Sequence, residues 1–349
     1  MRFLRWQELP VERGVNSMPD ALFVCTGAGL LALAAGAALD MALGDPERPT
    51  HPVVLMGAAV AWGDKFFRSL TSLSPKIQGG LMALFLTAAA YGAAALILKA
   101  ALAINLYCWS AAASIMIFYG LALRTLCREV GSVAEALSEH GLEPARRQIS
   151  RLVSRKTSDL QEPQVASAAI ETAAENLVDG VISPFFYAAL GGPALMAAFK
   201  MISTMDSMIG YKTEDYIQFG RAAARMDDAA NYLPARISLV FIALAAFILF
   251  GRKRAASVIP AALSQGGFHS SPNSGLPEAA FAAALGVKIG GPCTYFGKRI
   301  EGHWYNQEAP DPGPDDVRQS ISLLMLSSVL FYVTVLLLGL LCFLAGLVP

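Results

Sequence analysis

Four long stretches of the chain contain no charged side chain; they cover residues 21–39, 79–98, 100–123 and 319–349. A helix of about 20 apolar residues is long enough to cross the hydrocarbon core of a bilayer. The pattern therefore predicts four membrane-spanning helices. The first stretch also fits a secretory signal, but its length and the spans that follow favour a retained helix.

Two further apolar segments are less regular. Residues 181–199 are uncharged but contain two prolines and the pair Gly191–Gly192, so one kinked span and two half-helices that dip in and return are both open interpretations. Residues 232–251 form another apolar stretch. We expect an all-α, polytopic membrane protein with about four to six membrane segments, one of them re-entrant if residues 181–199 return. The side on which residues 205–231 lie depends on that choice.

The most hydrophilic part of the chain lies between the third and fourth charge-free stretches. Its first half, residues 124–156, carries seven Arg or Lys, and basic loops favour the cytoplasm. Its apolar positions recur at helical spacing. We treat residues 1–349 as a single membrane domain in which 124–180 is a cytoplasmic helical segment and 1–20 an N-terminal extension. The loop after the first helix is expected to face the same side of the membrane as segment 124–180, because two spans separate the loop from that segment.

Composition narrows the class further. The 349 residues are 55% hydrophobic and 15% charged, with no formal net charge, whereas soluble domains are about 25% charged. A soluble enzyme, a disulfide scaffold, a disordered chain and a nucleic-acid binder are all disfavoured. The five cysteines form no CxxC pair and the four histidines lack metal-ligand spacing, so we expect no structural metal.

Polar side chains gather in four blocks at the ends of apolar segments. In the second block, Glu171, Glu175 and Asp179 would share one face of a continuous helix, because residues four apart lie one above the other. Three stacked carboxylates repel one another. Either this face is simply hydrated, or a cation such as Mg²⁺ binds there.

The third block mixes acids and bases. Asp206, Asp227 and Asp228 lie close in sequence to Lys212 and Arg225, whose charges suit a phosphate group. A solvated loop that pairs its own charges would show the same composition, so this alternative stays open.

The first and fourth blocks add fewer charges. The first holds Asp45 and His51, and the fourth, residues 269–278, either positions a ligand or caps a helix. The chain has no GxxxxGK[ST] or HExxH motif, so a nucleotide would be bound without a P-loop. Together, the four blocks suggest a metal–nucleotide or polyphosphate site.

At these same blocks, and in the same order, the chain resembles the CobD/CbiB family of membrane amide ligases of cobalamin synthesis. The resemblance covers nearly the whole chain from about residue 25 onward, and Ser203 and Cys293 stand where asparagine is expected. The stretches that carry it are GDPERPTHPVVLMG (44–57), ETAAENLVDGVISPFFY (171–187), MDSMIGYK (205–212), FGRAAARMDDAANYLPAR (219–236) and SPNSGLPEAAFAAALGVKIGG (271–291).

The resemblance implies an ATP-dependent reaction with Mg²⁺ as the nucleotide's cofactor. ATP would activate a propionate carboxylate of adenosylcobyric acid, and aminopropanol phosphate or aminopropanol would attack it, giving adenosylcobinamide phosphate or adenosylcobinamide. We expect a site on the cytoplasmic side of the inner membrane; whether the protein works in a complex with later enzymes of the pathway is left open by the sequence.

Roles within the implied set are assigned as hypotheses. We expect Mg²⁺ contact from acids, phosphate contact from bases, proton transfer from the attacking ammonium, and substrate positioning by amides. The residues are Glu171, Glu175, Asp179, Asp227 and Asp228 for Mg²⁺; Lys212 and Arg225 for phosphate; Asp206, His51 and Lys212 for catalysis; and Asn176, Asn231, Asn273 and Glu278 for positioning.

Two other functions fit the same outline. An AmpE-like membrane regulator or sensor would need no ligase chemistry, and the retained acidic blocks argue against it. A transporter of a corrinoid or a phosphorylated solute would place ionisable residues inside its spans, and the four charge-free stretches contain none.

Overall fold

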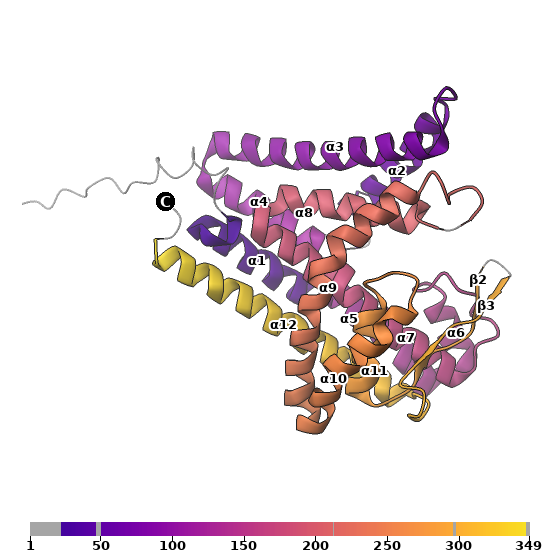
Figure 1. Ribbon diagram of the computed structural model, residues 1–349. Coiled ribbons are helices and arrows are strands. Elements are labelled where there is room, and N and C mark those ends of the chain that lie inside the picture. The colour runs from indigo at the N-terminus through magenta and orange to yellow at the C-terminus, as the bar shows by residue number, and fades with distance from the viewer. Residues whose placement is uncertain (1–21, 47–49, 212, 296–297, 347–349) are drawn as a thin grey trace, which may run out of the picture.

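The computed structural model describes residues 22–46, 50–211, 213–295 and 298–346. Helices dominate it, and two short antiparallel strand pairs join β1 to β4 and β2 to β3 (Figure 1). The helices are α1 (Gly27–Leu43), α2 (Pro52–Arg68), α3 (Pro75–Ile104), α4 (Leu106–Gly120), α5 (Leu123–Glu135), α6 (Leu142–Ile149), α7 (Glu162–Leu177), α8 (Ser183–Ile209), α9 (Arg221–Phe250), α10 (Arg252–Gln265), α11 (Gly275–Leu285) and α12 (Pro314–Leu344); the strands are β1 (Ile289–Gly290), β2 (Cys293–Tyr295), β3 (Lys298–Ile300) and β4 (Trp304–Tyr305).

Within the described residues, five helical stretches are long and apolar enough to cross a membrane. They are Pro75–Ile104, Leu106–His140, Glu162–Ile209, Arg221–Phe250 and Pro314–Leu344. Helix α1 is also apolar, but its 17 residues extend only about 26 Å. The structure confirms the prediction of an all-α, multi-pass membrane protein.

The apolar helices and the hydrophilic helices occupy different parts of the molecule. Helix α1 packs between α4 and α12, and α3 packs against both α4 and α8. The more hydrophilic helices α5, α6 and α7, together with α10 and α11, gather at the lower right in Figure 1. The second polar block lies on α7 and the π-helical turn after it, and the fourth leads into α11, so both belong to this part of the molecule.

Helix α8 is two half-helices that fold back on each other. Gly191 (φ −130°, ψ 20°) and Gly192 (φ 71°, ψ −170°) leave the helical conformation. The rings of Tyr187 and Phe199, on opposite sides of this break, stack with centroids 5.1 Å apart. In an unbroken helix twelve residues span about 18 Å, so the chain must reverse at the glycine pair. Of the two interpretations left open by the sequence, the returning half-helices are the one observed.

The loop after α1 adjoins the start of α5. The Asp45 backbone N–H donates to Thr125 Oγ1 over 2.7 Å, and the Leu123 N–H donates to the buried Asp40 carboxylate over 3.0 Å. These bonds place the two segments side by side. This agrees with the expectation that both lie on one side of the membrane, because the two spans α3 and α4 separate them in the sequence.

Helices α9 and α10 form a second reversal. Gly251, at φ 82°, makes the turn between them, and α10 then packs along both α9 and α11. The basic residues 252–254 are exposed at this turn. Helix α11 is buried over its whole length. Its run of alanines allows α7, α9 and α10 to surround it closely, which brings its one carboxyl group into the interior.

Candidate active site

Three aspartates from distant parts of the chain meet at the open end of the α8 hairpin. Asp179 lies in a π-helical turn before the first half-helix, Asp206 lies near the end of the second, and Asp227 lies in the first turns of α9. Asp179 and Asp227 interact electrostatically with each other, and both interact with Asp206 and with Glu175. The reversal at the glycine pair brings together acids that the sequence places in separate blocks.

Asp227 is held by its neighbours at one oxygen only. Asn231 Nδ2 donates to Asp227 Oδ2 over 3.0 Å, and Ser183 Oγ donates to Asn231 Oδ1 over 2.5 Å. The other oxygen, Asp227 Oδ1, is buried and accepts no hydrogen bond from the described residues. Buried polar atoms are normally satisfied, so this oxygen is suited to a ligand such as a cation.

Asn231 therefore positions a carboxylate, and substitution tests this role. We expect Asn231→Ala to lower the rate of the reaction at this site about 10- to 100-fold, the usual cost of losing a residue that orients a metal ligand. Substrate affinity should change less than the turnover number, because Asn231 is fully committed to protein partners. Steady-state kinetics would check this, and an unchanged turnover number would contradict it.

Lys200 is a functional candidate that the sequence analysis missed. It lies on the returning half of α8 and interacts electrostatically with Asp179, Asp45 and Asp227. Its ammonium makes no hydrogen bond or ion pair among the residues that the structure describes. In the sequence it is merely the first charged residue after an apolar stretch. Only the signal of a broken helix, whose end returns to its start, could have marked it.

Asp45 and His51 extend the site toward α4. His51 Nε2 lies 2.6 Å from Asp45 Oδ1, and the Val53 N–H donates to His51 Nδ1 over 3.2 Å. Since Nδ1 accepts, Nε2 carries the proton and donates it to the carboxylate. The ring also meets Tyr119 edge-on, with centroids 5.2 Å apart. Burial raises the pKa of Asp45, and His51 opposes that rise.

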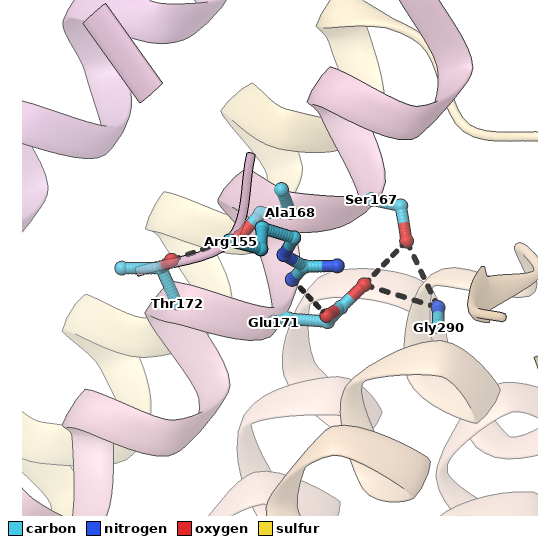
Figure 2. Close-up of polar contacts among 6 residues, drawn as sticks. All are labelled: Arg155, Ser167, Ala168, Glu171, Thr172 and Gly290. Carbon is cyan, nitrogen blue, oxygen red and sulfur yellow. Dashed lines mark hydrogen bonds and ion pairs between the residues drawn. The ribbon is translucent and has the colours of Figure 1, made fainter. Parts of the chain in front are cut away.

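Glu171 occupies a clamp of its own, drawn in Figure 2. Arg155 forms an ion pair with Glu171 Oε2, and both side chains are nearly buried. Ser167 Oγ donates to Glu171 Oε1 over 2.6 Å, and the Gly290 N–H donates to the same oxygen over 3.0 Å. The clamp ties α7 to β1 and to the segment before α7, so every side of this carboxylate is engaged.

The expected row of three carboxylates on one helix face is not formed. Helix α7 ends at Leu177, and a π-helical turn follows over Val178–Ile182. Its wider backbone spacing rotates Asp179 away from the face that carries Glu171. Glu175 lies between the two groups: Ser274 Oγ donates to it over 3.3 Å, and it interacts with Asp179. A π-turn inside an apolar run has no clear sequence signature.

Glu278 belongs to the group around the clamp. It is buried in α11 and hydrogen-bonds Tyr305. Burial, and then repulsion from Glu171 and Glu175, raises the pKa of Glu278 well above its ordinary value. Burial and the adjacent Glu278 also raise the pKa of Tyr305.

The raised pKa makes Glu278 a source of pH-dependent stability. Above its ordinary pKa the unfolded chain loses this proton while the folded chain keeps it, so the free energy of unfolding falls as pH rises. We expect Glu278→Gln to be more stable than the parent protein at pH 8 by a few degrees in unfolding temperature, with no difference at pH 4. Thermal unfolding in detergent measures this, with exposed Glu214→Gln as control. Equal pH slopes for parent and Glu278→Gln would contradict it.

The remaining predicted residues divide into structural partners and exposed groups. Asn273 Nδ2 donates to the Asp228 carbonyl over 2.8 Å and its Oδ1 accepts from Arg236, so it fixes the fourth block to α9. Asn176 Nδ2 donates to the Thr172 carbonyl of its own helix. The other three residues are Asp228, which accepts from Ser271 Oγ; Arg225, which is exposed at the start of α9; and Lys212, which lies outside the described residues.

The charge of the aspartate cluster would suit a divalent cation, although the oxygens of the three carboxylates do not all lie within 4.8 Å of one another, so the acids do not form a closed metal site. Asp179, Asp206 and Asp227 offer carboxylate oxygens, which are the ligands Mg²⁺ prefers, and one of these oxygens is buried and unsatisfied within the described residues. Glu175 stands beside them. Several acids around a single lysine leave an excess of negative charge that a divalent cation would offset.

Comparisons with known proteins cover most of the chain, including the residues of this site. Residues 33–324 match the family described as CobD/Cbib protein. The chain is 38% identical over 303 residues to "Cobalamin biosynthesis protein CobD" of Klebsiella pneumoniae, covering 86% of this chain and 94% of that protein. It is 38% identical over 294 residues to "Cobalamin biosynthesis protein CbiB" of Salmonella choleraesuis, covering 84% and 92%. It is 42% identical over 275 residues to the CobD protein of Geobacter metallireducens, covering 79% and 85%. No solved structure matches.

Proposed function

Because the chain belongs to the CobD/CbiB family and so has a role in cobalamin biosynthesis, we propose that it is an ATP-dependent amide ligase. It joins aminopropanol phosphate, or aminopropanol, to a propionate carboxylate of adenosylcobyric acid. The observation that best supports this reaction is the convergence of Asp179, Asp206 and Asp227 with Lys200 at one end of the α8 hairpin.

The first chemical step transfers a phosphoryl group. A propionate oxygen bonds to the γ-phosphorus of ATP, the bond to the β-phosphate oxygen breaks, and ADP leaves. Asp179, Asp227 and Glu175 would hold Mg²⁺, which when bound neutralises phosphate oxygens. Lys200 lies among these acids and would contact the transferring phosphate. Arg225, which is exposed, and Lys212 would be further phosphate contacts.

The second step forms the amide. The amine nitrogen bonds to the acyl carbon, and inorganic phosphate leaves with the former propionate oxygen. The amine must be neutral to attack, so a group at the site must take a proton from its ammonium form. The Asp206 carboxylate accepts no hydrogen bond from the described residues, so it is free for this task. His51 has both ring nitrogens engaged and is better suited to orienting Asp45.

We further propose that the protein lies in the inner membrane and that its site faces the cytoplasm. The segment rich in Arg and Lys, residues 124–156, adjoins the loop that carries Asp45, and basic segments remain on the cytoplasmic side. ATP is also supplied from that side.

The reaction is tested with purified protein, ATP, Mg²⁺, adenosylcobyric acid and each of the two amines, with products identified by mass spectrometry. We expect one ADP for each amide formed and no amide without ATP. Absence of amide with both amines, from protein that remains folded, would overturn the proposal.

A corrinoid transporter is the second candidate, because the returning half of the broken helix carries Lys200 and Asp206, and ionisable residues in broken helices are a feature of many transporters. Uptake of a corrinoid into proteoliposomes without ATP turnover would favour it over the ligase.

A further inference from the structure

Helix α9 is long enough to cross a bilayer, yet its two ends lie near the same part of the molecule. Its 30 residues extend about 45 Å. Near its start, Asp227 interacts electrostatically with Glu175, which belongs to the hydrophilic segment 124–180. The start of α9 therefore lies on the side of the membrane that this segment occupies.

The other end of α9 is joined to α11 through α10. Gly251 turns the chain into α10, and Ser257 Oγ of α10 donates to the Ala283 carbonyl of α11 over 3.4 Å. The Arg254 guanidinium occupies the place that a Cβ on Gly286 would fill, and Gly286 is the residue that ends α11. The turn between α9 and α10 thus lies beside the end of α11.

The chain that follows α11 returns to segment 124–180. The Gly290 N–H donates to Ser167 Oγ over 2.9 Å, and the Lys156 N–H donates to the Thr294 carbonyl over 2.8 Å. The four residues from Gly286 to Gly290 reach at most about 14 Å, whereas the hydrocarbon core is about 30 Å thick. Both ends of α9 therefore lie on one side of the membrane.

The hairpin of α9 and α10, residues 221–265, has an exposed apolar surface. Large apolar side chains recur at helical spacing on each of its two helices. They are Val240, Leu244, Phe247 and Ile248 on α9, and Ile259 and Leu263 on α10. The four on α9 are 48% to 60% exposed, and α9 and α10 meet at the bottom of Figure 1.

The tip of the hairpin is basic. Arg252, Lys253 and Arg254 follow one another and are exposed. Cations next to an apolar helical surface are typical of helices that lie in the membrane interface, and they are attracted to anionic lipids. The charge of the tip and the apolar surface beside it therefore fit the same partner, an anionic leaflet.

We propose that the hairpin does not cross the membrane but enters the leaflet on the side of segment 124–180, where residues 252–254 bind anionic lipid headgroups. The apolar side chains lie among the acyl chains, and the three cations lie against the phosphates. This arrangement keeps the basic tip on the side that basic segments prefer. Residues 205–231, between the α8 reversal and the hairpin, then lie on that side as well.

Cysteine labelling tests the side on which the tip lies. A membrane-impermeant maleimide added to intact spheroplasts should label Tyr107→Cys, because residue 107 is 87% exposed where α3 meets α4. Arg252→Cys should label only after permeabilisation, together with Ser150→Cys, which is exposed in segment 124–180. The parent gives the background from its five native cysteines. Labelling of Arg252→Cys on the side of Tyr107→Cys would overturn the proposal.

Lipid binding is tested with protein in nanodiscs of mixed phosphatidylglycerol and phosphatidylcholine, by counting the retained lipids with native mass spectrometry. We expect the double variant Arg252→Gln/Lys253→Gln to bind phosphatidylglycerol about 10- to 30-fold more weakly and phosphatidylcholine equally well. Arg147→Gln/Arg151→Gln, which removes two exposed charges from segment 124–180, is the matched control and should match the parent.

Two results would overturn the lipid assignment. One is equal phosphatidylglycerol affinity in the parent and in Arg252→Gln/Lys253→Gln. The other is a dimer that dissociates on Leu263→Lys, because a second copy of the chain would then cover the apolar surface.

Discussion

Asp227→Asn is expected to reduce the ligation rate about 100- to 1000-fold, the range found when one preorganised electrostatic contact to a reacting centre is removed. The substitution keeps the shape of the side chain but removes the charge beside Asp179 and Asp206. It also replaces the buried, unsatisfied Oδ1 with a group that binds Mg²⁺ less well. The loss should appear in the turnover number and in the affinity for Mg²⁺–ATP, measured by coupled ADP release.

Asp215→Asn is the control for this substitution. Asp215 is exposed in the segment before α9, and the described residues give its side chain no ion pair or hydrogen bond. Both variants should insert in the membrane and unfold at temperatures close to that of the parent. Normal turnover by Asp227→Asn would show that Mg²⁺–ATP is bound elsewhere.

Gly192→Ala is expected to destabilise the protein by about 2–6 kcal/mol. The backbone at Gly192, with φ 71° and ψ −170°, belongs to a region that is essentially restricted to glycine, at a cost of about 1–3 kcal/mol for other residues. An added Cβ would also lie 2.7 Å from Phe23 Cδ2, and overpacking of this kind costs about 1–3 kcal/mol more. Because this residue makes the α8 reversal, ligation should fall together with the unfolding temperature.

Gly92→Ala provides the comparison. Gly92 lies within α3, and an added Cβ there would meet no atom within 4 Å, so replacing a helical glycine should be neutral or slightly stabilising. Thermal unfolding in one detergent compares the two variants. If Gly192→Ala unfolded at the same temperature as Gly92→Ala, the reversal could not depend on this glycine.

The amino-acid sequence predicts the membrane helices well, because their signal is local. Runs without charge identify α3, α4 and α12 directly. The outcome for residues 181–199 could not be predicted, because a glycine pair followed by proline is compatible with a kink and with a reversal. The stacking of Tyr187 on Phe199 decides between them, and that contact is a property of the folded chain.

The candidate site shows the same division between local and tertiary information. The acidic blocks were visible in the sequence, yet their grouping was not. A π-helical turn separates Asp179 from Glu171, and Arg155 engages Glu171 from a preceding segment. Lys200 went unnoticed because its importance arises only when the returning half-helix brings it beside acids from other elements.

The proposed function depends on the claim that acids from α7, α9 and the turn before α8 hold one metal–nucleotide complex. Electron paramagnetic resonance of Mn²⁺, used in place of Mg²⁺, counts the bound ions directly. We predict one bound Mn²⁺ per chain that depends on ATP, with an affinity about tenfold weaker in each of Glu175→Gln, Asp179→Asn and Asp227→Asn. ATP-dependent Mn²⁺ binding of equal affinity in the parent and all three variants would contradict the claim.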